Sequence, residues 1–583
     1  MAKKLRKFQN SLILFASMAA VAVQSGTIWA NVYATNLGQS ANAFNTGQNV
    51  TLSYLLNESA TSATVEILNP SNTVVRSITG GTSVGVNQVI WDGKNNSNAN
   101  LPSGNYSFRV TSAGTARPGT AWTSISTDSV LNNFEQPRGV AVNKNPDSPY
   151  YGRVYVSNSR NLPTAAGRAM SDGLFMLNAD LSDTGIAVGT GPHAGGADWP
   201  SGGSVGPFRV EVGPDSSVYV TDWSDPHSGL WQAPADLSGN WTEILDSSSG
   251  RDAGGGTLVH GSISDVVITG TGASRKLYTA DEDLGVGGHI IYYNIGTDSV
   301  FTEAAGADPS HSGVFFNNAN SNVDAGGTGN WNINLFNSVA VDKRGDFWYS
   351  QNRSAGTDRA SLVRIDPTTG KINWDSLTSL GSPDPLRGTQ GIAYDPINDV
   401  IALATNIGGN IVILDALNRT VLTTFAFGGT TNTDLAFDNA GNLYVGNLSS
   451  ERVRIWAPPT DGTFAANLFS TNSLGPLGSI ALTAAAGLPG DFNSDGKVDA
   501  GDYATWRKNS GNASLPNDGG AVTQAARFTL WRANFGKPPG AGSGSGLGGN
   551  ATVPEPAAFV LVSIVGCALA GCRRRKSLHH NRV

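Results

Sequence analysis

The sequence has little cysteine, little charge and few histidines. Its two cysteines, Cys567 and Cys572, lie near the C-terminal end, so residues 31–552 contain no disulfide. Charged residues make up 14% of the chain. No histidine cluster, paired-carboxylate motif or nucleophile elbow stands out along it. These absences exclude a disulfide-stabilised scaffold and leave the common hydrolase classes without a recognisable motif.

Stretches suited to long amphipathic helices are also scarce, whereas residues suited to turns are abundant. The 583 residues include 72 glycines and many Asn, Ser and Thr. Glycine and asparagine supply the positive φ of tight turns, which short connected strands need in large numbers. One hydrophobic core usually serves about 100 to 200 residues. We therefore expect a mostly β protein of several domains.

The N-terminal segment has the pattern of a secretory signal. Four basic residues between Lys3 and Lys7 precede an apolar run at 11–23, and the small residue Ala30 follows at a suitable cleavage position. We predict a signal peptide over residues 1–30 and a mature start near Asn31. A membrane anchor is the alternative, although the apolar run is short for a span.

The C-terminal segment, residues 553–583, combines three signals. A Pro-Glu-Pro triplet at 554–556 precedes an apolar stretch at 557–572, and four basic residues follow at 573–576. An apolar segment followed by basic residues is a stop-transfer signal, so we expect one transmembrane helix here. The order of parts resembles the PEP-CTERM sorting signal of Gram-negative bacteria that make exopolysaccharide. The resemblance implies an exosortase-type processing protease as a partner, with transient membrane anchoring; a permanent anchor is the alternative.

Removing both ends makes the chain strongly acidic. The net charge of −7 loses the four basic residues of the leader, and the five basic residues and one acidic residue of the tail, and becomes about −15. An acidic surface disfavours nucleic acid and suits divalent cations. We expect an exported protein of the cell envelope, the cell surface or the extracellular space, with no nucleic-acid partner.

Residues 31–114 have the alternation of a β-sandwich. Apolar side chains recur at every second position in two strands around a turn-rich loop, at Val89, Trp91, Tyr106, Phe108 and Val110. The combination of Trp91-Asp92-Gly93, Gly104 and Tyr106 resembles the Ig-like domain of the flagellar hook-capping protein. That domain serves as a spacer on many secreted proteins, so no flagellar role is implied.

Residues 115–487 contain a repeated unit of successive short strands. Six copies begin near residues 139, 209, 265, 338, 391 and 434. A four-stranded propeller blade needs about 40 to 50 residues. We predict a six-bladed β-propeller in which the fragment at 478–483 completes the first blade. Seven blades are the alternative, with a weak blade around 160–205. The pattern resembles NHL and gluconolactonase/regucalcin-like propellers.

Residues 488–536 contain a calcium-loop pattern. Oxygen ligands alternate, a glycine stands at the sixth position and carboxylates return at the ninth and twelfth. The predicted Ca²⁺ ligands are Asp491, Asn493, Asp495, the backbone carbonyl of Lys497, Asp499 and Asp502. An Asp/Asn-rich turn without metal is the alternative.

The loop resembles a dockerin type I repeat, which has Asp at the twelfth position and one following helix, here Tyr503–Asn509. A second copy 25 residues later keeps "WRANFG" but places Pro516, Asp518, Gly520, Gln524 and Arg527 at the ligand positions. We expect one Ca²⁺ site and one repeat that has lost its metal. The resemblance implies a cohesin-like protein partner; an internal role, stiffening the junction before the tail, is the alternative.

Each second strand of the propeller repeat ends in a polar residue. These residues are Asn158, Asp222, Asp281, Gln351 or Asn352, Asn406 and Asn447. In gluconolactonase-like enzymes such side chains hold a divalent metal, so the resemblance implies a metal-assisted hydrolase acting on a sugar or lactone, with His227 and His289 as the nearest histidines. Hydrogen bonds to the turn backbone are the alternative that we favour.

Five tryptophans outside the alternating strands offer a surface for sugar stacking: Trp122, Trp199, Trp223, Trp231 and Trp241. Core packing is the alternative. With a Gly/Ser-rich linker at 537–552, the chain is expected to be a binding or interaction protein that engages polysaccharide or protein. A glycoside or lactone hydrolase of polysaccharide catabolism is the second hypothesis, so catalytic residues stay unknown.

Overall fold

The computed structural model describes fourteen segments of the chain. They are residues 31–159, 173–189, 206–223, 229–246, 263–281, 289–296, 312–317, 338–352, 355–357, 359–460, 478–483, 488–509, 514–521 and 523–537. The predicted leader and sorting tail lie outside them. No helix within these segments is long and apolar enough to cross a membrane. The described residues within 31–44 and 48–481 form one compact unit, and those within 45–47 and 482–537 form another.

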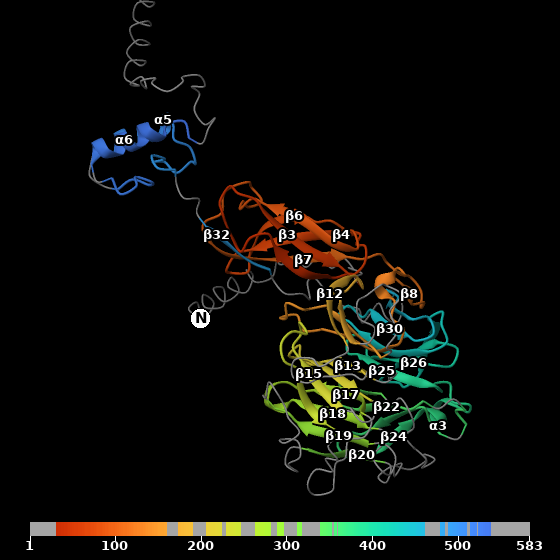
Figure 1. Ribbon diagram of the computed structural model, residues 1–583. Coiled ribbons are helices and arrows are strands. Elements are labelled where there is room, and N and C mark those ends of the chain that lie inside the picture. Colours follow the sequence, from red (N-terminus) through yellow and green to blue (C-terminus); the bar gives the residue numbers. More distant parts are fainter. Residues whose placement is uncertain are drawn as a thin grey trace, which may run out of the picture. The chain divides into compact units, whose positions relative to one another are not determined.

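The first part of the chain folds into two facing sheets, in the strand orders β1-β3-β6 and β2-β32-β7-β4-β5 (Figure 1). The strands are β1 Ala34–Gln39, β2 Ala43–Asn45, β3 Val50–Leu56, β4 Ser62–Leu68, β5 Val74–Thr79, β6 Gly85–Trp91, β7 Gly104–Ala113 and β32 Gly478–Thr483. Buried and partly exposed residues alternate along β7, as the period of a strand requires. The expected Ig-like sandwich is present.

Each residue of the Trp91-Asp92-Gly93 turn has a different structural role. The Trp91 ring is 1% exposed and packs edge-on against Phe44 and Tyr106, at centroid distances of 5.3 and 5.6 Å. The Asp92 side chain accepts a hydrogen bond from Lys94 N at 3.2 Å. Gly93 has a φ of 77°, which a residue with a Cβ seldom adopts. The motif therefore combines a core anchor with a tight turn.

Strand β32 corrects one expectation. We expected residues 478–483 to complete the first propeller blade, but they lie between β2 and β7 in the sandwich. Ile480 and Leu482 are each 1% exposed there. A Cβ on Gly478 would fall 1.8 Å from the Phe108 ring, so only glycine fits at that point. The fragment is a returning strand of the Ig-like domain.

Each of the six predicted repeats forms one four-stranded antiparallel sheet among the described residues. The sheets have the orders β9-β10-β11-β12, β13-β14-β15-β16, β17-β18-β19-β20, β21-β22-β23-β24, β25-β26-β27-β28 and β29-β30-β31-β8. The innermost strands contact their neighbours in sequence order, and β29 returns to contact β9. These strand orders and contacts make a propeller-like ring of six sheets, whose strands Figure 1 labels. A seventh blade around 160–205 was the alternative. In the described part of that insert, β11 and β12 belong to the first sheet.

The bounds of the ring strands follow in chain order. They are β8 Thr123–Ser124, β9 Pro137–Val142, β10 Val154–Asn158, β11 Gly173–Leu177, β12 Asp183–Gly189, β13 Val210–Val212, β14 Val218–Asp222, β15 Gly229–Ala233, β16 Thr242–Asp246, β17 Ile263–Thr269, β18 Lys276–Asp281, β19 His289–Asn294, β20 Ser312–Asn317, β21 Val339–Val341, β22 Phe347–Ser350, β23 Leu362–Ile365, β24 Ile372–Asp375, β25 Thr389–Asp395, β26 Val400–Thr405, β27 Asn410–Asp415, β28 Val421–Ala426, β29 Asn432–Phe437, β30 Leu443–Asn447 and β31 Arg452–Ala457. Short helices occur at η1 Val130–Asn132, η2 Gly272–Ser274 and α3 Ser376–Leu380.

The ring closes through its N-terminal strand. Strand β8 pairs with β31, placing Ser124 opposite Trp456 and Thr123 opposite Ala457. Just before β8, the Trp122 ring stacks on Phe425 at 5.7 Å with an interplanar angle of 12°. The sixth sheet therefore takes its outer strand from the start of the repeat region, which ties the two ends of the ring together.

Burial along the strands follows their place in each sheet. Every residue of β10, β14, β26 and β30 is buried, because neighbouring sheets cover both faces of these second strands. Strand β28, at the outer edge, has exposed and partly buried residues only. The second strands therefore read as continuous apolar runs, which explains why the repeat was visible in the sequence.

Residues 488–537 contain two helices, α5 Ala500–Lys508 and α6 Gln524–Asn534. Their core includes Phe492, Val498 and Trp531. The two repeats are joined by matching hydrogen bonds: Trp506 Nε1 donates to Gln524 O at 3.2 Å, and Trp531 Nε1 donates to Asp499 O at 2.8 Å. Each donor and each acceptor is 25 residues from its counterpart, which is the offset of the repeat seen in the sequence. Helix α5 begins earlier than the predicted Tyr503 because Asp499 and Asp502 form a capping box at its start.

Candidate functional site

The first position of each repeat forms a layer around the centre of the ring. In chain order the six residues are Gly139, Arg209, Asp265, Ser338, Gly391 and Asp434. Each of the six lies directly before the apolar run of an innermost strand. Because the innermost strands lie side by side around the ring, these positions can exchange hydrogen bonds across sheets.

Arg209 connects three other sheets. Its guanidinium donates to Arg138 O in the first sheet, to Thr433 O in the sixth at 2.7 Å and to Gln390 O in the fifth at 2.7 Å. It also lies 3.5 Å from Asp434 Oδ1. The residue is 1% exposed. A buried arginine with carbonyl and carboxylate partners links these sheets across the centre of the ring.

The acceptor side chains of the layer bind backbone N–H groups of the next sheet. Asp434 Oδ2 accepts from Val140 N at 2.9 Å, which joins the sixth sheet to the first. Asp265 Oδ2 accepts from Val339 N at 2.9 Å and from Ser338 Oγ at 2.6 Å. Ser338 Oγ in turn accepts from Ile392 N at 3.1 Å. The layer is therefore a chain of hydrogen bonds between sheets.

The two glycines of the layer allow the backbones of neighbouring sheets to approach closely. A Cβ on Gly139 would lie 2.7 Å from Val210 N, and a Cβ on Gly391 would lie 2.8 Å from Thr433 O. Both distances are too short for a real carbon atom. The small residues therefore let the backbones of neighbouring innermost strands approach closely.

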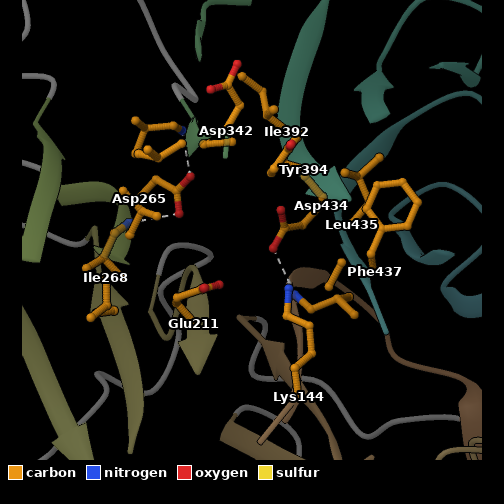
Figure 2. Close-up of a pocket in the computed structure, with 18 of the residues that line it drawn as sticks. Lys144, Glu211, Asp265, Ile268, Asp342, Ile392, Tyr394, Asp434, Leu435 and Phe437 are labelled. Carbon is orange, nitrogen blue, oxygen red and sulfur yellow. Dashed lines mark hydrogen bonds between the residues drawn. The ribbon is translucent and has the colours of Figure 1, made fainter. Parts of the chain in front are cut away.

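A cavity of about 330 Å³ adjoins this layer along the centre of the ring. All six innermost strands contribute to its wall, and Glu211, Asp265 and Asp434 face it (Figure 2). Lys144 and Tyr394 also line it. Glu211 follows Arg209 by two positions and so points to the same side of β13. The sequence offered no signal for this site, because the six repeats place different residue types at equivalent positions.

The carboxyl groups of the cavity hold their protons more tightly than usual. Burial raises the pKa of Glu211 to about 8, against the lowering effect of Lys144. Burial likewise raises the pKa of Asp434 to about 7, and the Arg209 charge opposes the rise. The pKa of Asp265 is raised by the same cause and opposed by the same arginine. Glu211 is partly exposed to the cavity, and its raised pKa favours the protonated form at neutral pH.

The stability of the ring should fall as pH rises through this range. Unfolded Glu211 loses its proton near pH 4.3 and native Glu211 near pH 8, so the unfolded state binds fewer protons between these values. Relative to Glu211→Gln, the wild type should lose about 2–4 kcal/mol of unfolding free energy between pH 5 and pH 9. Urea unfolding at a series of pH values measures this difference. Glu66→Gln in the Ig-like domain is the control; parallel curves for wild type and Glu211→Gln would contradict the assignment.

The predicted ring of polar residues at the ends of the second strands does not line the cavity. Asn447 Oδ1 accepts from Ser450 N at 2.8 Å, and Asn158 Oδ1 accepts from Gln136 N at 2.7 Å. Gln351 Nε2 donates to Ala360 O at 2.5 Å. Asn406 Nδ2 donates to Asn352 Oδ1 at 3.0 Å. Asn158, Gln351 and Asn447 therefore bond backbone atoms, as the turn alternative requires, whereas Asn406 and Asn352 bond each other through their side chains.

The remaining members of that ring and the two histidines are less fully described. Asp222 is 1% exposed at the end of β14. Asp281 and His289 pair with each other through the backbones of β18 and β19, and their side chains lie outside the described part of the structure. His227 lies outside the described residues altogether.

Three of the five tryptophans are core residues and not a sugar-binding surface. Trp122, Trp231 and Trp241 are 6%, 7% and 1% exposed. Trp223 is partly buried beside Phe208, at a ring distance of 5.6 Å. Trp199 lies outside the described residues. Core packing, the commoner fate of tryptophan, therefore holds for Trp122, Trp231 and Trp241, whose large side chains fill spaces between strands and sheets.

The predicted calcium loop is a compact turn. Asp491 and Asp502 are buried, at 2% and 0% exposure. Asp491 accepts from Asp495 N at 3.2 Å and Gly496 N at 3.0 Å; Asp502 accepts from Asn493 N at 3.0 Å and Asp499 N at 2.8 Å. The oxygen donors suit Ca²⁺ in chemistry. Within the described segments, however, no three acidic, histidine or cysteine side chains gather closely enough to hold a metal.

Residues 38–116 match the FlgD Ig-like domain family. The match covers strands β2 to β7 of the sandwich and its Trp91-Asp92-Gly93 turn, and it confirms the resemblance drawn from those residues. No curated protein matches the chain.

Several solved structures resemble the chain at low identity. A protein of unknown function from Bacteroides thetaiotaomicron VPI-5482 has a TM-score of 0.37 and 10% identity, over 74% of this chain and 99% of that one. The calcium-binding protein regucalcin from Agrobacterium tumefaciens str. C58 has a TM-score of 0.35 and 13% identity, over 58% and 94%. The WD40 β-propeller domain of Doa1 has a TM-score of 0.32 and 13% identity, over 62% and 91%. Similarity at this level says nothing about ligand or activity.

Proposed function

We propose that the protein is an exported binding or interaction protein of the cell surface or extracellular matrix, which engages polysaccharide or protein. The observation that carries the proposal is the joining of the Ig-like domain to the propeller-like ring. Tyr33 and Leu55 of the first pack with Tyr151, Ala179 and Ala440 of the second in one buried cluster. Two joined β domains present a large preformed surface, which lowers the entropic cost of binding a partner.

The full chain should therefore retain a partner without converting it. Immobilised exopolysaccharides and extracellular proteins from exopolysaccharide-producing bacteria are the probes, with retention measured by pull-down. Retention with no release of reducing sugar supports the proposal. Turnover of a glycoside or lactone would overturn it in favour of a hydrolase.

The hydrolase is the second candidate, and the axial cavity is the observation that favours it. The carboxyl of Glu211 faces that cavity, and its raised pKa favours the protonated form that a general acid needs. If the ring hydrolyses lactones or glycosides there, Glu211→Gln should remove the activity and leave binding intact. Activity unchanged by this substitution would exclude the cavity as the reaction site.

We also propose that the loop at 491–502 binds one Ca²⁺ ion, held by Asp491, Asn493, Asp495, Lys497 O, Asp499 and Asp502. Binding would draw the carboxylates away from the backbone N–H groups that they now accept from. Calorimetry of the chain with Ca²⁺ should give a stoichiometry near one, and Asp495→Ala should weaken binding at least about tenfold. Asp415→Ala, in a turn of the fifth sheet, is the control. No heat of binding would contradict the site.

The sorting tail and the calcium module suggest further partners. An exosortase-type protease would process residues 553–583, so that the membrane anchor is transient; without this cleavage the anchor would be permanent. A cohesin-like protein would bind residues 488–536. Mass spectrometry of the exported protein would locate both processed ends.

A further inference from the structure

Asn31, where the mature chain is predicted to begin, is wholly buried in the joint between the Ig-like domain and the ring. Its Nδ2 donates to Pro458 O at 3.0 Å, just beyond β31. Its backbone carbonyl accepts from Asn57 Nδ2 of the Ig-like domain at 3.0 Å and from Asn442 Nδ2 of the sixth sheet at 2.7 Å. One residue at the chain's predicted start thus binds both domains.

Three hydrogen-bond acceptors of the joint lack a donor. Asn31 Oδ1, Asn442 Oδ1 and Glu58 Oε1 are buried and have no hydrogen-bond partner within the described segments. The orientation of both amides is fixed, because the Nδ2 of each already donates to an oxygen. Buried acceptors without donors cost free energy, and each calls for an explanation.

A buried carboxyl belongs to the same network. Asn442 Nδ2, which donates to Asn31 O, also donates to Asp438 Oδ2 at 2.8 Å. Asp438 is 2% exposed, and burial raises its pKa to about 7. The groups that oppose this rise are neutral hydrogen-bond donors of Asn442, Ala440 and Tyr33. A cation in the joint would therefore favour the charged form of Asp438.

We propose that cleavage before Asn31 completes this joint, because the freed α-ammonium group brings a positive charge and three N–H donors to the unpartnered acceptors around residue 31. In the uncleaved chain the same nitrogen is an amide with one N–H and no charge. Removal of the leader thereby locks the Ig-like domain onto the ring, and the rigid two-domain form arises only after export. This processing-dependent lock is independent of which partner the protein binds.

The test compares chains that differ by one residue at the start. One begins at Asn31 and the other at Ala30; both run to Val583 and are released, in the same detergent, from a leader by a protease that leaves no extra residue. The Asn31 chain should melt about 2–5 °C higher. It should also exchange its backbone amides near residues 31–33 and 442–444 more slowly. The Asn31 chain with an acetylated α-amino group should behave like the Ala30 chain.

A pair of asparagine variants separates this lock from general destabilisation. Asn442→Ala should abolish the difference between the two chains. Asn398→Ala should preserve it, because Asn398 holds the corresponding hairpin of the fifth sheet through Asp395 Oδ2 at 2.5 Å. Equal melting temperatures of the Asn31, Ala30 and acetylated chains would overturn the proposal. So would an exported protein that starts at a residue other than Asn31.

Discussion

Replacing Arg209 with methionine should destabilise the ring by about 3–5 kcal/mol, the usual cost of removing one partner of a buried ion pair. The change leaves Asp434 and Asp265 in the centre of the ring without their nearest positive charge. It also leaves the carbonyls of Arg138, Thr433 and Gln390 without a donor. Urea unfolding followed by tryptophan fluorescence measures the loss.

The control is Arg109→Met in the Ig-like domain. Arg109 pairs with Glu66 at 2.6 Å, but its side chain is 39% exposed, so its loss should cost under about 1 kcal/mol. Adding Asp434→Asn to Arg209→Met should recover part of the stability, because it removes the unpaired carboxyl. If the Arg209→Met protein were as stable as the Arg109→Met protein, Arg209 would not stabilise the ring.

The sequence predicted where this layer begins but not what it does. The repeat starts near 139, 209, 265, 338, 391 and 434 coincide with the six positions of the layer, because the apolar run of each innermost strand follows directly. The residues themselves differ from repeat to repeat. The arginine and the hydroxyl donate hydrogen bonds between sheets, the two carboxyls accept them, and the two glycines leave space for the neighbouring backbones. No pattern within a single repeat can reveal such a division of roles.

Two connections were beyond prediction for a different reason. Strand β8 closes the ring with only two residues, Thr123 and Ser124, too few for any period to be seen. Strand β32 has the same apolar alternation as a blade strand, so its pairing with the sandwich depends on contacts far away in the sequence. The turn at Trp91-Asp92-Gly93, in contrast, was predictable because its requirements are local.

Replacing Arg527 with methionine should unfold residues 488–537 even when Ca²⁺ is saturating. Arg527 stands 25 residues after Asp502, at the last ligand position of the second repeat. It is 2% exposed, and its Nε donates to Asp518 Oδ2 at 3.1 Å. Asp518 also accepts from Leu515 N and Gly520 N, each at 3.0 Å, so the carboxylate organises the loop around it. The guanidinium thus supplies the positive charge that a metal ion is predicted to supply in the first repeat.

The two repeats share one core through Phe492, Val498 and Trp531, so loss of either loop weakens both helices. Chelation of Ca²⁺ should loosen the segment, whereas Arg527→Met should abolish its order with or without the ion. Hydrogen exchange of peptides from α5 and α6 in the full chain measures both effects. Arg532→Met, one turn further along α6 at an exposed position, should leave exchange unchanged. If added Ca²⁺ fully protects the Arg527→Met segment, the arginine is not the internal cation of the second loop.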